Sequence, residues 1–150
     1  MSESNPFRVF VSHAWDRCEE YSRLFEYLES TTNFYYKSVS EPDKAPPGES
    51  IADGRSRILD AMKEAESFVL LADLYSKHRD WLDFEISAAK AHDLPIIVVE
   101  HFGPKDLSEE LRETADKIVG WNARTIEDAI RMESRHDDTK RFDMIEFDLS

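Results

Sequence analysis

One glutamate of the sequence stands where an acidic side chain is unexpected. When residues 81–92 are projected as a helix at about 100° per residue, the apolar side chains gather on one side and Glu85 falls among them. An ionised carboxylate that faces a core costs several kcal/mol unless it is paired or opens onto a cavity. In a site poor in water it can stabilise positive charge that develops during a reaction. Glu85 therefore either projects into a cleft and does chemistry, or is structural. In the structural case, backbone donors or an arginine hold it, or it reaches solvent past the helix end.

Several spacings that would indicate another chemistry are missing from the sequence. The four glycines are too far apart to form the G-x-G-x-x-G of a dehydrogenase. The segment around Ser56 lacks the second glycine of a nucleophile elbow. The five histidines show no H-E-x-x-H spacing, and the lone Cys18 cannot build a cysteine-based zinc site. We therefore expect no metal.

Apolar runs alternate with helical patterns and define the elements that must position these side chains. Strands are expected at about residues 7–12, 33–39, 67–72, 94–99 and 117–121, in alternation with five helices. This alternation predicts an α/β fold, a flavodoxin-like three-layer sandwich around a five-stranded parallel sheet of order 2-1-3-4-5. Ligands of such sheets bind beyond the carboxyl ends of the strands, at the switch point between strands 1 and 3. By that rule, we expect one cleft to be lined by Ser12, His13, Ser38, Ser40 and the loop 73–79.

Polar residues that can cap helices predict where the helices begin. Asp16 is expected to start the first helix, and Asp80, Asp106 and Thr125 are expected to start later ones. The segment 40–48 contains three prolines, which exclude a helix or a central strand. We expect a loop there that is long enough to act on a ligand.

The motifs at these positions resemble those of TIR domains. Trp81 and Glu85 form a W-x-x-x-E motif on the helix that follows the third strand. Residues 9–16, VFVSHAWD, look like the TIR strand-1 signature, and residues 34–40 with their proline-rich continuation occupy the place of the BB loop. The closing segment 118–122, IVGWN, is more similar to the bacterial TIR-like proteins of Thoeris antiphage systems, the ThsB type. The resemblance covers nearly the whole chain.

This resemblance implies an enzyme that consumes NAD+. In catalytic TIR domains the motif glutamate contacts the nicotinamide ribose, nicotinamide leaves through an oxocarbenium-like state, and the ADP-ribose is cyclised, hydrolysed or transferred. By this resemblance Glu85 is catalytic, NAD+ is a substrate with no separate cofactor, and an ADP-ribose-derived product carries an antiphage signal to a downstream effector. The implied substrate contacts come from Ser12, His13 and Trp15 after strand 1, from Ser38, and from Trp81 beneath Glu85.

Composition and charge limit which binding partners and which cellular location we expect for this protein. Nineteen Lys and Arg against 32 Asp and Glu give a net charge of −13. The sequence holds no basic patch, so we expect neither nucleic acid nor a membrane surface as a partner. No apolar run approaches the roughly 20 residues of a membrane helix. With one cysteine there is no internal disulfide, so a cytoplasmic protein is expected. The 150 residues predict a single TIR-like domain with a core at about 7–135 and a charged tail at 136–150.

Two other functions share this architecture. A receiver domain would need an acidic pair after strand 1, an aspartate after strand 3 and a lysine after strand 5, and only Asp73 fits. A TIR-like domain that only binds, as a self-associating scaffold, is the nearer competitor. Because burial of a carboxylate is costly, an intact Glu85 in the apolar sector favours catalysis over pure binding.

Overall fold

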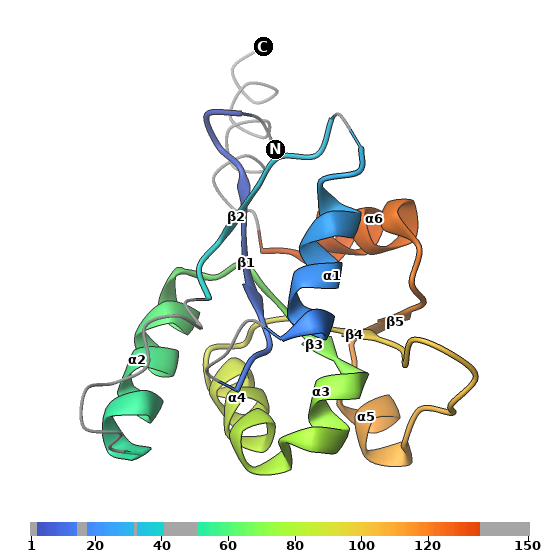
Figure 1. Ribbon diagram of the computed structural model, residues 1–150. Helices are drawn as coiled ribbons and strands as arrows, with labels where there is room; N and C mark the ends of the chain where they lie inside the picture. Colours follow the sequence, from blue (N-terminus) through green and yellow to red (C-terminus); the bar gives the residue numbers. More distant parts are fainter. Residues whose placement is uncertain (1–2, 15–17, 32, 41–50, 136–150) are drawn as a thin grey trace.

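Five parallel strands form the central sheet. The computed structural model describes residues 3–14, 18–31, 33–40 and 51–135. In this part of the chain the strand order is β2-β1-β3-β4-β5 and every neighbouring pair is parallel, which confirms the predicted architecture (Figure 1). The strands are β1 (Phe7–Val11), β2 (Tyr36–Ser38), β3 (Ser67–Leu71), β4 (Ile96–Val99) and β5 (Lys117–Val119).

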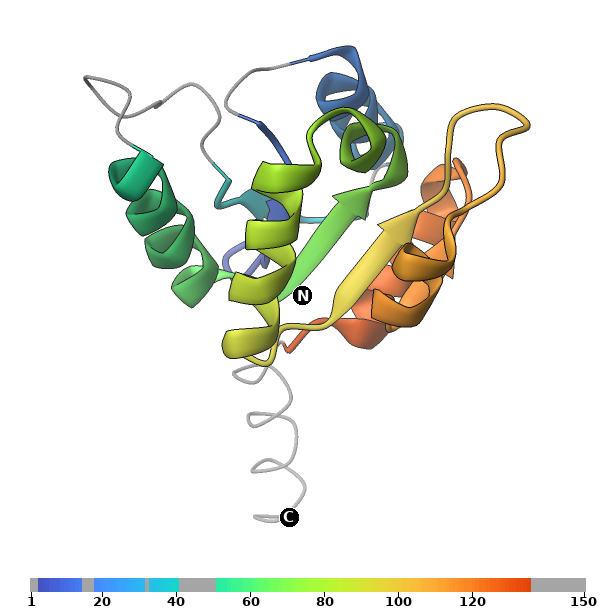
Figure 2. The same ribbon diagram turned by 90° about the horizontal axis from the view of Figure 1, so that it is seen from below.

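Helices cover both faces of the sheet and complete the three layers (Figure 2). The pair α1 and α6 packs together on one face, and the pair α2 and α4 lies side by side on the other. The long helices turn stripes of apolar residues inward, because those residues recur every three or four positions. In chain order the helices are α1 (Glu19–Leu28), α2 (Ile51–Glu64), α3 (Ala72–Lys77), α4 (Arg79–Ala91), α5 (Glu109–Thr114) and α6 (Ala123–Glu133).

The core is centred on β3 and β4. Every residue of both strands is buried, because helices cover the two faces of a parallel sheet. In the register of the sheet, Phe68 of β3 lies between Phe10 of β1 and Ile96 of β4. The near-continuous apolar runs that predicted these strands are what burial on both faces requires.

The segment after β3 differs from the prediction. We expected a loop at 73–79, but residues Ala72–Lys77 form the short helix α3, and only His78 separates it from α4. Leu74 and Tyr75 are buried in this helix. Burying both side chains at adjacent positions favours a compact helical turn over an exposed loop. The expected count of five helices was therefore wrong, since the described residues contain six.

Three predicted helix caps were also wrong, by two or three residues. The cap position of α4 is His78, two residues before Asp80. Ser108, not Asp106, caps α5 with its side-chain oxygen. For α6 the cap is Asn122, whose Oδ1 accepts hydrogen bonds from the Thr125 N–H at 2.9 Å and the Thr125 hydroxyl at 3.0 Å. A cap needs an extended backbone as well as a suitable side chain, and the sequence pattern shows only the side chain.

Some predictions fall on residues outside the described part of the chain. These are Trp15, the helix start at Asp16, residues 41–48 of the proline-rich loop, and the tail 136–150. The first helix itself is present and begins at Glu19. Among the described helices, none combines the length and the apolar character needed to cross a membrane.

Candidate active site

Glu85 is the most unusual carboxylate of the described residues. Its side chain, on the second turn of α4, is fully enclosed, with 0% of its surface exposed. Oε1 accepts a hydrogen bond from the His13 N–H at 3.3 Å, and Oε2 has no hydrogen-bond partner among the described residues. Burial raises the pKa of the Glu85 carboxyl well above its usual value of 4.5, and the His13 N–H opposes that rise. Within the described part of the chain, Glu85 thus neither reaches solvent nor pairs with an arginine, and one backbone donor holds it.

The end of β1 supplies that donor from a rigid backbone. Ser12 is completely buried; its N–H donates to the Val69 carbonyl and its Oγ accepts from the Leu71 N–H, both at 2.9 Å. The next residue, His13, is also buried, and its ring stacks on Phe10 with the centroids 5.5 Å apart. These contacts fix the backbone at the carboxyl end of β1, where the sequence placed the cleft.

Ser38 belongs to a cluster of three hydroxyl groups at the end of β2. Its Oγ lies 2.8 Å from the Oγ of Ser40, which in turn lies 2.9 Å from the Tyr21 hydroxyl. The Tyr21 ring meets the His13 ring edge-on, with the centroids 6.4 Å apart. The structure brings Ser12, His13 and Glu85 together as predicted, whereas Ser38 is linked to His13 only through Ser40 and Tyr21 and lines a separate cavity beside α1.

Trp81 lies one helical turn before Glu85 and faces a cavity between α2 and α4. The cavity has a volume of about 380 Å³. The Trp81 side chain is half-buried, and it is packed against the core on its inner side. The lining combines two aromatic rings, one aliphatic side chain and three charged groups: Trp81, Phe84, Ile51, Arg55, Asp80 and Asp83. We call this space the α2–α4 cavity.

The sequence was compared with families of known proteins. A family model described as the TIR-like domain of the Thoeris protein ThsB matches residues 10–106, more than half of the chain. The chain belongs to this family. It is thus a TIR-like protein of an antiphage defence family. Among curated proteins, none matches the chain.

The match contains most of the predicted site of this ThsB-family protein. It begins on β1 and ends after β4, so it includes both the hydroxyl cluster and the W-x-x-x-E motif. The closing segment 118–122, which contributed to the resemblance, lies beyond the matched residues. There Trp121 donates from Nε1 to the Glu100 carbonyl at 2.8 Å.

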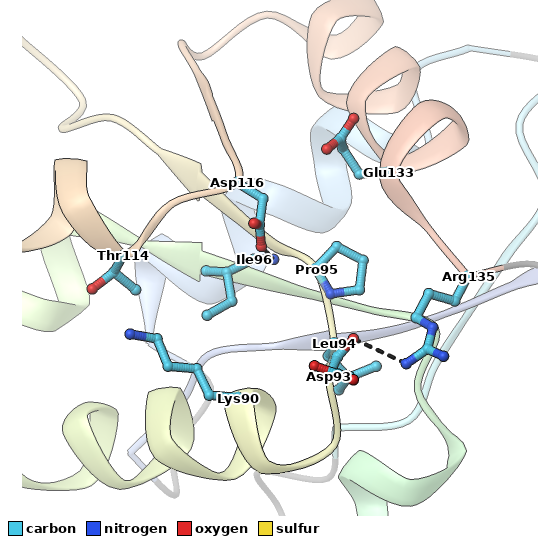
Figure 3. A pocket seen from close by; sticks show the side chains of 9 residues that line it. All are labelled: Lys90, Asp93, Leu94, Pro95, Ile96, Thr114, Asp116, Glu133 and Arg135. Atoms are coloured by element: carbon cyan, nitrogen blue, oxygen red, sulfur yellow. Dashed lines mark hydrogen bonds between the residues drawn. The ribbon is translucent and has the colours of Figure 1, made fainter.

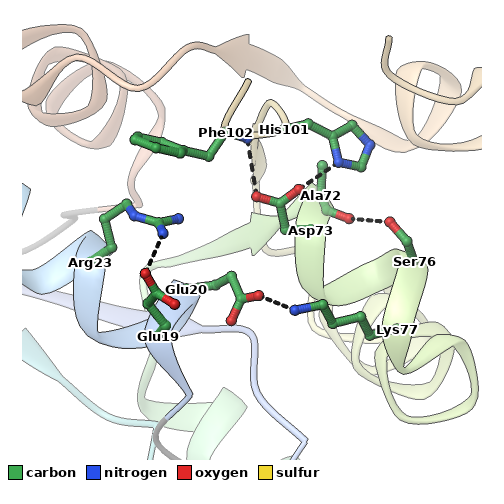
Figure 4. Close-up of polar contacts among 9 residues, drawn as sticks. All are labelled: Glu19, Glu20, Arg23, Ala72, Asp73, Ser76, Lys77, His101 and Phe102. Atoms are coloured by element: carbon green, nitrogen blue, oxygen red, sulfur yellow. Dashed lines mark hydrogen bonds and ion pairs between the residues drawn. The ribbon is translucent and has the colours of Figure 1, made fainter. Parts of the chain in front are cut away.

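A second polar cluster of the ThsB-family domain lies where β3 and β4 end (Figure 4). Asp73 Oδ1 is 2.7 Å from His101 Nδ1, and Asp73 Oδ2 accepts from the Phe102 N–H at 3.0 Å. Beside it, Lys77 of α3 pairs with Glu20 of α1. The prediction placed the segment after β3 at the cleft but missed His101. That histidine follows the apolar run of β4 as Asp73 follows the run of β3, and this parallel is the signal that could have found it.

At the opposite end of the sheet, a cavity of about 420 Å³ lies where β4 begins (Figure 3). Arg135 donates from Nη1 to the carbonyls of His92 and Asp93, at 3.3 and 3.0 Å. Asp116 accepts from the Ile96 N–H at 2.7 Å. Because these side chains tie the end of α4 and the start of β4 into the fold, we assign them a structural role.

Metal binding has little support among the described residues. They contain no group of three or more His, Cys, Asp or Glu side chains that could hold a metal ion. The expected absence of a metal stays a prediction for the chain as a whole.

Proposed function

We propose that this ThsB-family protein cleaves nicotinamide from NAD+ and makes an ADP-ribose-derived signal, with Glu85 as the catalytic carboxylate. The observation that carries the proposal is the state of Glu85: a fully enclosed carboxyl group with one oxygen free of hydrogen bonds. A structural carboxylate is usually compensated by an arginine or several donors. Among the residues that the structure describes, Glu85 has only the His13 N–H as a donor, so its burial is explained better by charge that arrives with a substrate.

The proposed reaction breaks the bond between the nicotinamide nitrogen and the ribose anomeric carbon. The electron pair of that bond leaves with nicotinamide, which becomes neutral, and positive charge develops on the ribose. Glu85 as a carboxylate stabilises that charge in surroundings of low dielectric constant. A water oxygen, or a nucleophilic atom of the same or another molecule, then bonds to the anomeric carbon and gives up its proton where it carries one.

The protonation state of Glu85 is part of this proposal. Burial raises the pKa of its carboxyl group, which favours the neutral form in the absence of a cation. The positive nicotinamide ring favours the carboxylate and lowers the pKa again when the substrate binds. Because the carboxylate is the active form, kcat/KM should rise with pH through the raised pKa of Glu85 and then level off.

The other predicted site residues have different roles in the proposed reaction. His13 offers its backbone N–H to Glu85, and Ser12 holds that backbone through its bond with Leu71. We keep Ser38, Trp81 and Trp15 as substrate contacts.

A second candidate function is a scaffold that binds other proteins or a second copy of itself. An exposed aromatic surface favours it: Phe102 is 53% exposed, and the Arg23 guanidinium carbon lies 4.0 Å from the centroid of its ring. Trp121 packs edge-on against Phe102, with the centroids 5.7 Å apart. Arginine and large aromatic residues are enriched among the side chains that carry protein–protein binding energy.

The test compares NAD+ consumption by the wild type and by Glu85→Gln, in infected cells and with purified protein. Mass spectrometry would follow NAD+, nicotinamide and new ADP-ribose species. We expect loss of NAD+ and a new product with the wild type and neither with Glu85→Gln. Glu127→Gln is the matched control, because Glu127 is also a buried glutamate but lies on α6. If wild type and Glu85→Gln leave NAD+ equally intact during infection, the scaffold function is the better explanation.

A further inference from the structure

The α2–α4 cavity, of about 380 Å³, lies beside the W-x-x-x-E motif and takes no part in the bond cleavage proposed above. The two helices lie side by side on one face of the sheet (Figures 1 and 2). Trp81 lines the cavity, and Glu85 follows on the same helix four residues later. That spacing is about one turn, or roughly 6 Å along the axis. Trp81 is therefore shared by the motif and the cavity, while Glu85 is fully buried and does not line the cavity.

Arg55 of α2 is the cationic side chain of this cavity. Its guanidinium carbon lies 5.2 Å from the centroid of the Phe84 ring. Within the residues that the structure describes, Arg55 makes no hydrogen bond and no ion pair, although Asp80 and Asp83 line the same space. An arginine has five N–H donors in a planar fork that matches a phosphate group. Such a side chain, held over an aromatic ring and without an ion pair in the described part of the chain, is available for an anionic ligand.

The two aspartates of the cavity differ in their availability. Asp83 accepts a hydrogen bond from the Tyr75 hydroxyl at 2.8 Å, so one of its oxygens is already used. Asp80 has no side-chain partner among the described residues. Carboxylates accept hydrogen bonds from ribose hydroxyls in nucleotide sites. The acidic groups oppose binding of a free phosphate ion, so they select for a ligand that brings hydroxyl groups together with its phosphate.

We propose that the α2–α4 cavity binds the adenosine-phosphate half of the dinucleotide, with Arg55 on a phosphate and Phe84 beside the base. The three kinds of side chain in the cavity match the three parts of a nucleotide: rings for the base, Asp80 for the ribose and Arg55 for the phosphate. The inference rests on the proposed function for the identity of the dinucleotide. The presence of the cavity and the identity of its lining residues do not depend on the proposed function.

The first test measures binding of ADP-ribose by calorimetry, since ADP-ribose lacks nicotinamide and is not cleaved by the proposed reaction. Arg55→Ala should weaken binding about 10- to 100-fold, the usual effect of losing hydrogen bonds to a charged group. Arg57→Ala is the matched control: Arg57 is exposed on the same helix and does not line the cavity. Adenosine, which has no phosphate, should bind Arg55→Ala and wild type equally.

A second variant tests the base contact. Phe84→Leu keeps an apolar side chain of similar length but removes the ring, and should weaken ADP-ribose binding about 5-fold or more. Ribose 5-phosphate lacks the base, so its binding should depend on Arg55, and Phe84→Leu should weaken it less than it weakens ADP-ribose binding, since the ring then acts only by supporting the Arg55 guanidinium. This contrast separates a lost contact from a general distortion of α4.

The outcomes separate this inference from the proposed function. If the wild type consumes NAD+ but ADP-ribose binds Arg55→Ala as tightly as wild type, the inference is wrong and the function stands. If no NAD+ is consumed but ADP-ribose binding requires Arg55, the nucleotide site stands and the function is wrong. Equal weakening by Arg57→Ala would mean attraction by surface charge alone and would overturn the site. No binding of ADP-ribose to the wild type would overturn it as well.

Discussion

Replacement of Glu85 by glutamine should stabilise the folded protein at neutral pH. The Glu85 carboxyl is fully buried with one hydrogen-bond donor, and its pKa in the folded protein is raised well above 4.5 by burial. The folded state therefore keeps this proton to a higher pH than the unfolded chain does. Between the two pKa values the folded state binds more protons, so the free energy of unfolding of the wild type falls as pH rises.

The size of the effect follows from one titrating proton. The free energy of unfolding changes by at most about 1.4 kcal/mol per pH unit in that window. The glutamine variant has no such proton. Its advantage over the wild type should be smallest below pH 4.5, grow through the window, and stay constant above the folded-state pKa of Glu85. For a chain of this size, each kcal/mol corresponds to about 2–4 °C in Tm.

Urea unfolding of both proteins across this pH range measures the difference directly. Glu127→Gln serves as the control, because Glu127 accepts a hydrogen bond from the Thr31 hydroxyl at 2.6 Å. Weakening that bond should destabilise the protein by about 1 kcal/mol at neutral pH, the opposite sign. A Glu85→Gln protein that is less stable than the wild type at neutral pH, or whose advantage is the same at every pH, would refute the reasoning. It would mean that the folded state compensates the carboxylate of Glu85 fully.

Two further substitutions test the supports of the site and of α6. Ser12→Ala removes the oxygen that accepts the Leu71 N–H and leaves that donor buried and unpaired, so urea unfolding should show a loss of about 1–3 kcal/mol. Asn122→Ala removes the cap of α6 and should cost about 1 kcal/mol in the same assay, whereas Thr125→Ala, at the residue that the sequence favoured as the cap, should cost less.

The order of the sheet could be predicted because its physical causes lie in short stretches of sequence. Residues 68–71 and 96–99 are wholly apolar, and only strands covered on both faces bury such runs. The helical patterns between the strands force parallel crossovers, which leave few topologies. The errors lie at helix ends and in α3, where one or two tertiary contacts decide. Tyr75, for example, donates to Asp83 and is buried against its neighbours, and no local pattern contains that contact.

The parts of the site that depend on residue type could be predicted from the sequence. The angular position of Glu85 among apolar neighbours follows from helical periodicity, and the structure confirms that it is buried. The donor that holds it is a backbone N–H of His13, which every residue except proline possesses, so residue types could not reveal it. Arg55 was missed for another reason. Both Arg55 and Arg57 are exposed on α2, and only the packing of α2 against α4 decides which one faces the cavity.

The predicted stability of Glu85→Gln and its predicted loss of NAD+ cleavage have the same physical origin. A weakly polar environment makes the uncompensated carboxylate of Glu85 costly in the free protein. The same environment strengthens the attraction between that carboxylate and a cation, because little solvent screens it. A residue kept for structure would show the reverse relation, in which the variant that loses activity also loses stability. Gain of stability together with loss of NAD+ cleavage in one substitution would therefore support catalysis more strongly than either measurement alone.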